Sequence, residues 1–129
     1  MMIQVSRGLA LAGGILAPLA ETIRRWSTWR ESPANLFDDY IIGGFLLYGF
    51  WRTGKNLRDG QRVLAAAWAF ACGLGYYSFF GQLNSMRLGV IDPAPISSGW
   101  VLLIKGVAVT LAVVALVSSL RRLPENIEQ

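Results

Sequence analysis

Four apolar stretches, each flanked by charged or polar residues, dominate the pattern of hydrophobic and polar positions along the chain. The most apolar one runs from Gly99 to Leu120, and the next runs from Val63 to Phe80. Two shorter ones, Gly8 to Ala20 and Tyr40 to Trp51, must extend past polar residues to reach the roughly 20 residues that a bilayer crossing needs. A segment in lipid must satisfy its own backbone hydrogen bonds, so each stretch is predicted to be a helix.

The pattern therefore predicts an all-α, polytopic membrane protein, a single four-helix membrane domain over residues 1–129. We expect transmembrane helices at about 3–22, 36–53, 62–82 and 98–120. The segment between the first two helices holds Trp26 and Trp29, whose rings suit headgroup depth, and is predicted to be an interfacial helical segment. Composition agrees with this: 53% of the residues are hydrophobic and 16% are charged, where soluble domains average about a quarter charged.

Lysine and arginine counts in the short connections predict the orientation of these helices. With four crossings, seven cations share the side of both termini, and four lie on the opposite side. Both termini are therefore expected in the cytoplasm, and we place the protein in a bacterial inner (cytoplasmic) membrane. The seven are Arg7, Arg52, Lys55, Arg58, Arg62, Arg121 and Arg122, and the four are Arg24, Arg25, Arg30 and Arg87.

Small residues recur at four-residue spacing within these segments, as they do where membrane helices pack closely. The third segment has two such rows, Ala65, Ala69 and Gly73, and Ala67, Ala71 and Gly75. Gly43 and Gly44 supply small residues in the second segment. These rows fit packing within one bundle, and they equally fit contact with another protomer. We expect a homo-oligomer or a subunit of a larger membrane complex, although the sequence does not say which row serves which contact.

Lys105 is the one charge well inside an apolar run, and an ionisable residue in a membrane is a functional-site hypothesis when it has a partner. Residue counting puts Asp38 roughly 10 Å and Lys105 roughly 6 Å from the midplane of the bilayer, in the same leaflet. A polar pocket is one interpretation, and its candidate lining is Asp38, Asp39, Tyr76, Tyr77, Gln82 and Lys105. The structural alternative is that Asn35 caps the second helix, the aspartates complement its dipole, and Lys105 snorkels outward.

The residue types that are missing limit the chemistry. There is no His, the single Cys72 cannot form an internal disulfide, and no spacing typical of metal ligands or phosphate loops occurs. We accordingly expect no cofactor and no metal. The net charge of +4 is scattered over helix ends, which fits the lipid bilayer as a partner and does not indicate nucleic-acid binding.

One short segment, R30-E-S-P-A-N-L-F-D38, resembles the membrane-associated eicosanoid and glutathione metabolism family in its arginine, asparagine and acid near the start of the second helix. The resemblance implies a four-helix membrane enzyme acting on a lipophilic substrate. It covers about ten residues, its spacing differs by one, and the third helix lacks the family's arginine, so no glutathione site is transferred.

Three functions therefore stay open. The first is an oligomeric or accessory membrane subunit without enzymatic activity, which the small-residue rows favour. The second is a small oligomeric transporter or channel that uses the Lys/Asp cluster. The third is the membrane enzyme.

Overall fold

The computed structural model describes residues 2–24, 33–90 and 97–121, and every regular element in these ranges is a helix. The four helices are α1 (Met2–Arg24), α2 (Pro33–Lys55), α3 (Leu57–Arg87) and α4 (Ser98–Leu120). The predicted all-helical class is confirmed. The segment predicted to be interfacial falls largely on residues 25–32 and lies outside the described residues.

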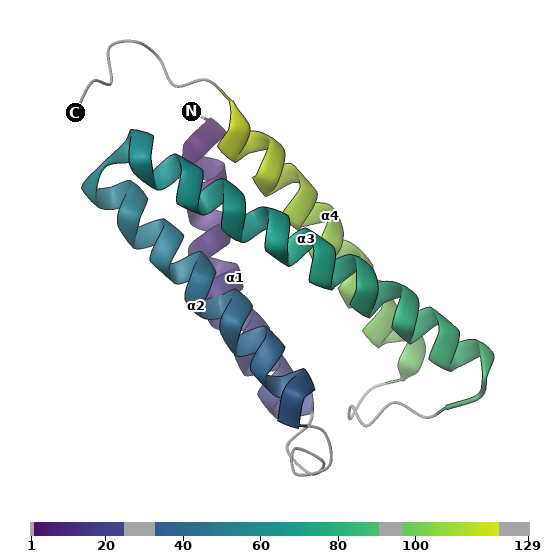
Figure 1. The fold of residues 1–129 in the computed structure, drawn as a ribbon. Coiled ribbons are helices and arrows are strands. Elements are labelled where there is room, and N and C mark those ends of the chain that lie inside the picture. The colour runs from purple at the N-terminus through teal and green to yellow at the C-terminus, as the bar shows by residue number, and fades with distance from the viewer. Residues whose placement is uncertain (1, 25–32, 91–96, 122–129) are drawn as a thin grey trace.

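The helices form two antiparallel pairs, α1 with α2 and α3 with α4, and α2 also packs along α3 (Figure 1). The start of α1, the turn between α2 and α3, and the end of α4 all lie at one end of the bundle. We call this the closed end. The two pairs diverge at the other end, where α1 runs towards α2 and α3 runs towards α4. We call this the open end.

Three of the described helices contain stretches that are long and apolar enough to cross a membrane, Ile3–Ile23, Leu57–Arg87 and Ser98–Leu120. The protein is accordingly a helical membrane protein with at least three candidate spans. The helix α2 is not among these spans, because it interrupts its apolar stretch with Asp38 and Asp39 near one end and with Arg52 and Lys55 near the other.

Local capping explains why α3 is longer than the predicted span of 62–82. The helix begins at Leu57 because the Asn56 side chain accepts hydrogen bonds from the backbone N–H groups of Arg58 and Asp59. At its other end, Gly89 has a φ of +73°, and the amides of Gly89 and Val90 donate to Met86 and Ser85. This is a Schellman motif, which needs a residue without a Cβ at that position.

The start of α2 differs from the sequence-based alternative in which Asn35 is its N-cap. The helix begins at Pro33, three residues before the predicted start at residue 36, because proline already has a helical φ and its missing N–H is not needed in the first turn. Asp38 and Asp39 consequently lie in the second turn of α2.

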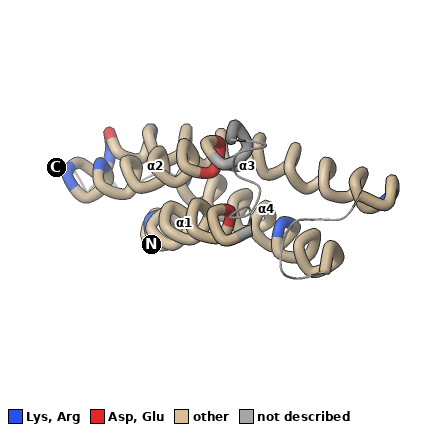
Figure 2. Tube along the Cα trace, turned by 90° about the horizontal axis from the view of Figure 1, so that it is seen from below, with Lys and Arg blue, Asp and Glu red and all other residues tan. Residues whose placement is uncertain are grey.

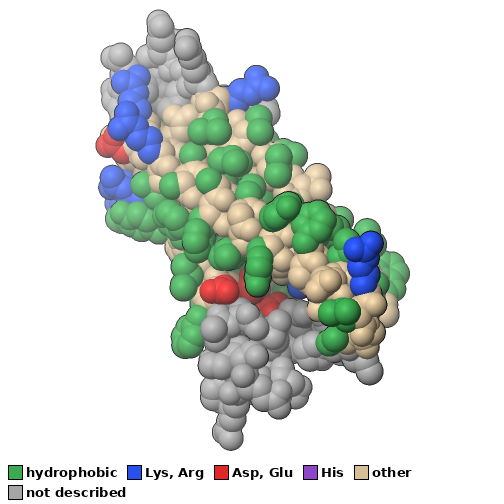
Figure 3. All heavy atoms as spheres, turned by 45° about the vertical axis from the view of Figure 1, so that its right-hand side comes forward, with side chains coloured by type: hydrophobic (Ala, Val, Ile, Leu, Met, Phe, Trp, Pro, Cys, Tyr) green, Lys and Arg blue, Asp and Glu red, His purple; other side chains and the backbone are tan. Residues whose placement is uncertain are grey.

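The core is built from small side chains and a few large ones. Its buried members come from all four helices, and more than half of them are alanines: Ile3, Ala10, Leu46, Leu64, Ala67, Trp68, Ala71, Ala112 and Ala115. Many leucine, valine and aromatic side chains face outward instead, and hydrophobic side chains cover the middle of the face in Figure 3. Such a distribution suits a lipid surrounding, where close backbone approach rather than the burial of large side chains holds helices together.

Candidate functional site

The polar cluster predicted around Lys105 is represented by a contact between α3 and α4. The Nζ atom of Lys105 donates to Oε1 of Gln82 at 3.4 Å. Gln82 is 6% exposed and Lys105 is half-buried, and both have further interactions. Charge-assisted hydrogen bonds are typically about 2.7 to 2.9 Å long, so this one is weak. It still supplies a polar companion for an ammonium within an apolar helix.

The two aspartates of the predicted cluster lie on α2 at the open end. Asp38 is exposed, and Asp39 is half-buried and takes part in an interaction. Figure 2 looks at the molecule from below and shows acidic segments of α1 and α2 and a basic segment of α4 near the middle of the view. In the space-filling view, acidic and basic side chains lie beside each other at the lower edge of the hydrophobic face (Figure 3). Opposite charges thus gather at the open end.

The two tyrosines of the predicted cluster point away from the bundle. Tyr76 is 63% exposed and Tyr77 is 78% exposed. The ring of Tyr76 packs against that of Phe80, with 4.8 Å between centroids. Of the six predicted residues, the structure therefore joins Gln82 to Lys105 and leaves both tyrosines on the outer surface of α3.

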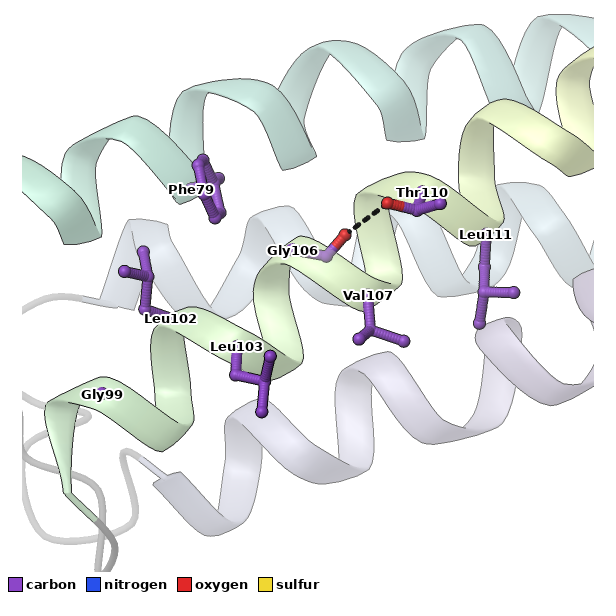
Figure 4. A pocket seen from close by; sticks show the side chains of 8 residues that line it. All are labelled: Phe79, Gly99, Leu102, Leu103, Gly106, Val107, Thr110 and Leu111. Atoms are coloured by element: carbon purple, nitrogen blue, oxygen red, sulfur yellow. Dashed lines mark hydrogen bonds between the residues drawn. The ribbon is translucent and has the colours of Figure 1, made fainter.

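A cavity of about 490 Å³ lies along α4, and its lining is apolar apart from Thr110. Phe79 reaches from α3 towards Gly106, while Leu103, Val107 and Leu111 point away from α3 (Figure 4). The hydroxyl of Thr110 donates to the Gly106 carbonyl at 2.9 Å and is therefore occupied within its own helix. None of the described residues that line this cavity is charged, so its described lining offers space for an apolar group.

The two small-residue rows of α3 have different surroundings. Ala67 and Ala71 are buried, and a Cβ added to Gly75 would come within 2.9 Å of Val109 on α4. In the other row, Ala69 and Gly73 are exposed, and a Cβ at Gly73 would meet nothing within 4 Å. One row therefore packs inside the molecule, and the other lies on its surface. The inner row consists of Ala67, Ala71 and Gly75, and the outer row consists of Ala65, which is half-buried, Ala69 and Gly73.

The adjacent glycines of α2 divide in the same way. A Cβ at Gly43 would come within 2.8 Å of the Gly14 carbonyl oxygen and within 2.5 Å of the Pro18 ring, whereas Gly44 has open space around it. Pro18 has no N–H, so the Gly14 carbonyl lacks its usual partner within α1. Gly43 lets α2 approach that carbonyl directly.

Polar contacts between helices at the closed end were not predicted from the sequence. The Nε atom of Arg7 donates to the Thr53 hydroxyl at 2.8 Å, and the Gln61 side-chain amide donates to the carbonyls of Ser119 and Arg121, each at 2.7 Å. Nearer the open end, the hydroxyls of Thr22 and Tyr40 are 2.6 Å apart. The hydrogen-bond partners in these contacts are 18 to 60 residues apart in the chain. They form no local sequence pattern, so only the three-dimensional arrangement reveals them.

Comparison with known proteins does not add an identity. No family model, no curated protein and no solved structure matches this chain. Within the described part of the chain, no group of three or more acidic, cysteine or histidine residues is placed to hold a metal ion.

Proposed function

We propose that this chain is a small integral membrane protein that acts as an oligomeric or accessory subunit, assembled through the outer small-residue row of α3. The observation that carries the proposal is the outer row, in which Ala65 is half-buried, Ala69 and Gly73 are exposed, and a Cβ added to Gly73 would meet nothing within 4 Å. Small residues at four-residue spacing let two helix backbones approach closely, which gains van der Waals contact that lipid chains do not supply.

A comparison of α3 with α2 supports this assignment. Gly44 of α2 is as open as Gly73, but the residues four positions before and after it are Tyr40 and Tyr48, both about half exposed. Their rings would hold a neighbouring helix away from Gly44. The residues four and eight positions before Gly73 are alanines, so a partner helix can lie directly on the α3 backbone from Ala65 to Gly73. It must diverge beyond Gly73, where Tyr77 is 78% exposed.

The proposal includes four membrane crossings, with α2 as the fourth. At 23 residues α2 is about 34 Å long, enough for the hydrocarbon layer, and it packs along α1 and α3, which are both candidate spans. Its charged residues lie in the second turn and at the end, near the two surfaces. Four crossings place both termini on the side with more cations, the cytoplasmic side of a bacterial inner membrane, and make the segment around residues 25–32 interfacial.

Cysteine cross-linking in native membranes tests the interface. In a Cys72→Ala background, Ala69→Cys is expected to give a covalent dimer on mild oxidation, or a covalent adduct with a partner protein. Gly44→Cys, in equally open surroundings, is the matched control and is expected to stay monomeric. Gly73→Leu should abolish the native association seen by mass spectrometry from mild detergent. The proposal would be refuted if mass spectrometry detected only monomers, without a bound partner protein, for both the wild type and Gly73→Leu.

A second candidate is a small oligomeric transporter or channel, and the bond between Lys105 and Gln82 is the observation in its favour. A charged amine held at an amide within apolar helices is the kind of group that ion pathways use. Four helices enclose little space, so this candidate also needs oligomerisation. Flux into proteoliposomes that is the same for the wild type and for Lys105→Met would remove it.

A further inference from the structure

Basic residues from three helices gather at the closed end of the bundle. They are Arg7 of α1, Arg52 and Lys55 of α2, and Arg58 and Arg62 of α3, and Arg121 directly follows α4 at the same end. The blue groups at the upper left of Figure 3 show part of this surface. Asp59 is the one acidic residue among the described residues of this end. Within the described ranges, Arg52, Lys55, Arg58 and Arg62 make no ion pair with a carboxylate. Among the described residues of this end, Asp59 is therefore the only negative charge that offsets these cations.

One face of α2 joins this charge to an aromatic surface. Tyr48, Trp51, Arg52 and Lys55 follow each other at spacings of three, one and three residues, so they share a face. Tyr48 and Trp51 are 49% and 53% exposed, and their ring centroids are 5.8 Å apart. The Nζ atom of Lys55 lies 5.9 Å from the Trp51 ring. Along this face the surface changes from aromatic to cationic towards the end of the helix.

Arg52 differs from the cations that are fully exposed. It is half-buried, and its Nε atom is enclosed without a hydrogen-bond partner among the described residues. A long side chain held in this way loses less conformational freedom when its charged group binds a ligand. Lys55, one turn further on, and Arg58, just beyond the turn, are exposed and can approach the same ligand.

We propose that this surface binds an anionic phospholipid of the surrounding membrane. Its phosphodiester lies against Arg52, Lys55 and Arg58, and an acyl chain runs along Trp51 and Tyr48. The polarity of the surface runs in the same direction as that of the lipid, from charged headgroup to apolar chain. A lipid with a cationic choline headgroup lacks net negative charge and gains less from three cations. Nucleic acid would reach the cations but not the aromatic part, which lies at membrane depth.

Lipid titration monitored by native mass spectrometry tests the proposal. The full-length protein in mild detergent is titrated with phosphatidylglycerol and with phosphatidylcholine of the same acyl chains. The wild type is expected to prefer phosphatidylglycerol, and the double variant Arg52→Gln, Lys55→Gln is expected to lose about fivefold in that preference for each cation removed. Trp51→Ala should weaken binding of both lipids, because the acyl chain loses its aromatic surface.

Arg87→Gln is the matched control, since Arg87 is an exposed cation at the other end of α3. It should leave the preference unchanged, and circular dichroism should show equal helix content in all variants. Equal binding of the two lipids by the wild type, or equal losses in the double variant and the control, would overturn the proposal. Displacement of the lipid by inorganic phosphate in the same titration would also overturn it, by showing a site for free phosphate instead.

Discussion

The two ends of the bundle are held together by different means. At the closed end, Gly60 of α3 lies against the backbone of α2 at Thr53, and Ser6, Ser118 and Ser119 are fully buried among the helices. At the open end, large apolar side chains such as Leu103 and Ile23 stay more than half exposed, and the hydrogen bond between Lys105 and Gln82 is long. Small residues at an end allow the helix backbones to meet, and bulky ones keep them apart.

This difference follows from the solvent. In water, exposed leucine and valine would draw the open end together, because burying them gains free energy in proportion to apolar area. In lipid that gain is absent, and packing between backbones takes its place. The stability of this protein should therefore depend on glycines at the closed end far more than on polar residues at the open end.

Gly60→Val should have the largest effect. A Cβ at Gly60 would come within 2.6 Å of the Arg52 carbonyl carbon and overlap backbone atoms of Thr53. The short turn between α2 and α3 keeps these two helices close together, so they cannot move apart to make room for the new side chain. We therefore expect a loss of about 3 kcal/mol in the free energy of unfolding. A denaturation titration with SDS in mixed micelles, followed by circular dichroism, measures it.

The control for this variant is Gly81→Val, on the same helix, where an added Cβ meets nothing within 4 Å. It should unfold with nearly the same midpoint as the wild type. Equal losses for the two variants would mean that the loss in Gly60→Val does not come from the contact with Thr53.

Gly43→Ala is expected to have the next largest effect. The new methyl group would press on the Pro18 ring and on the Gly14 carbonyl oxygen, and the backbone oxygen cannot rotate away. We expect a loss of about 1 to 2 kcal/mol in the free energy of unfolding, in the same titration. Gly44→Ala, one residue away and in open surroundings, should be neutral or stabilising by up to about 1 kcal/mol, since alanine is the better helix former.

This pair of glycines illustrates what the sequence could and could not predict. Hydrophobic runs predicted the helices because their length and composition are local properties, and the ends of α3 were missed by several residues although Asn56 and Gly89 are recognisable caps. Which of Gly43 and Gly44 faces another helix depends on how α2 is rotated about its axis. With small residues on both sides of the helix, the sequence pattern leaves that rotation open.

The prediction of the candidate site from the sequence had the same limit. Residue counting placed Lys105 in the same leaflet as Asp38, and the structure joins Lys105 to Gln82, another member of the predicted cluster. Counting along a helix gives depth but not direction, so Tyr76 and Tyr77 were included although both point outward. The bonds from Gln61 to the end of α4 were missed because a glutamine next to a cationic segment has no distinctive spacing.

Gln61→Met should have a smaller effect than either glycine variant. The Gln61 amide donates to two carbonyls at the end of α4, Ser119 and Arg121, at a helix end where carbonyls lack partners within the helix. Methionine keeps the length of the side chain and removes the donor, so we expect a loss of about 1 kcal/mol in the free energy of unfolding.

Gln61→Glu separates hydrogen bonding from packing at the same position. A carboxylate cannot donate and would face two carbonyl oxygens, so this variant should be destabilised at least as much as Gln61→Met at neutral pH. If Gln61→Glu instead unfolds like the wild type, the side-chain amide does not hold the ends of α3 and α4 together.

Lys105→Met should have the smallest effect, although it removes the most conspicuous polar residue of the membrane segments. The bond to Gln82 is long, and removing the amine also removes the cost of holding a charge within apolar surroundings, so the two contributions oppose each other. We expect the free energy of unfolding to change by about 0.6 kcal/mol or less, the average that polar contacts contribute between membrane helices. The SDS titration that measures the glycine variants provides the comparison. A loss as large as that of Gly43→Ala would show that the amine stabilises the packing of α4 against α3 as strongly as the small residues stabilise their contacts, and the contrast between the two ends would then be wrong.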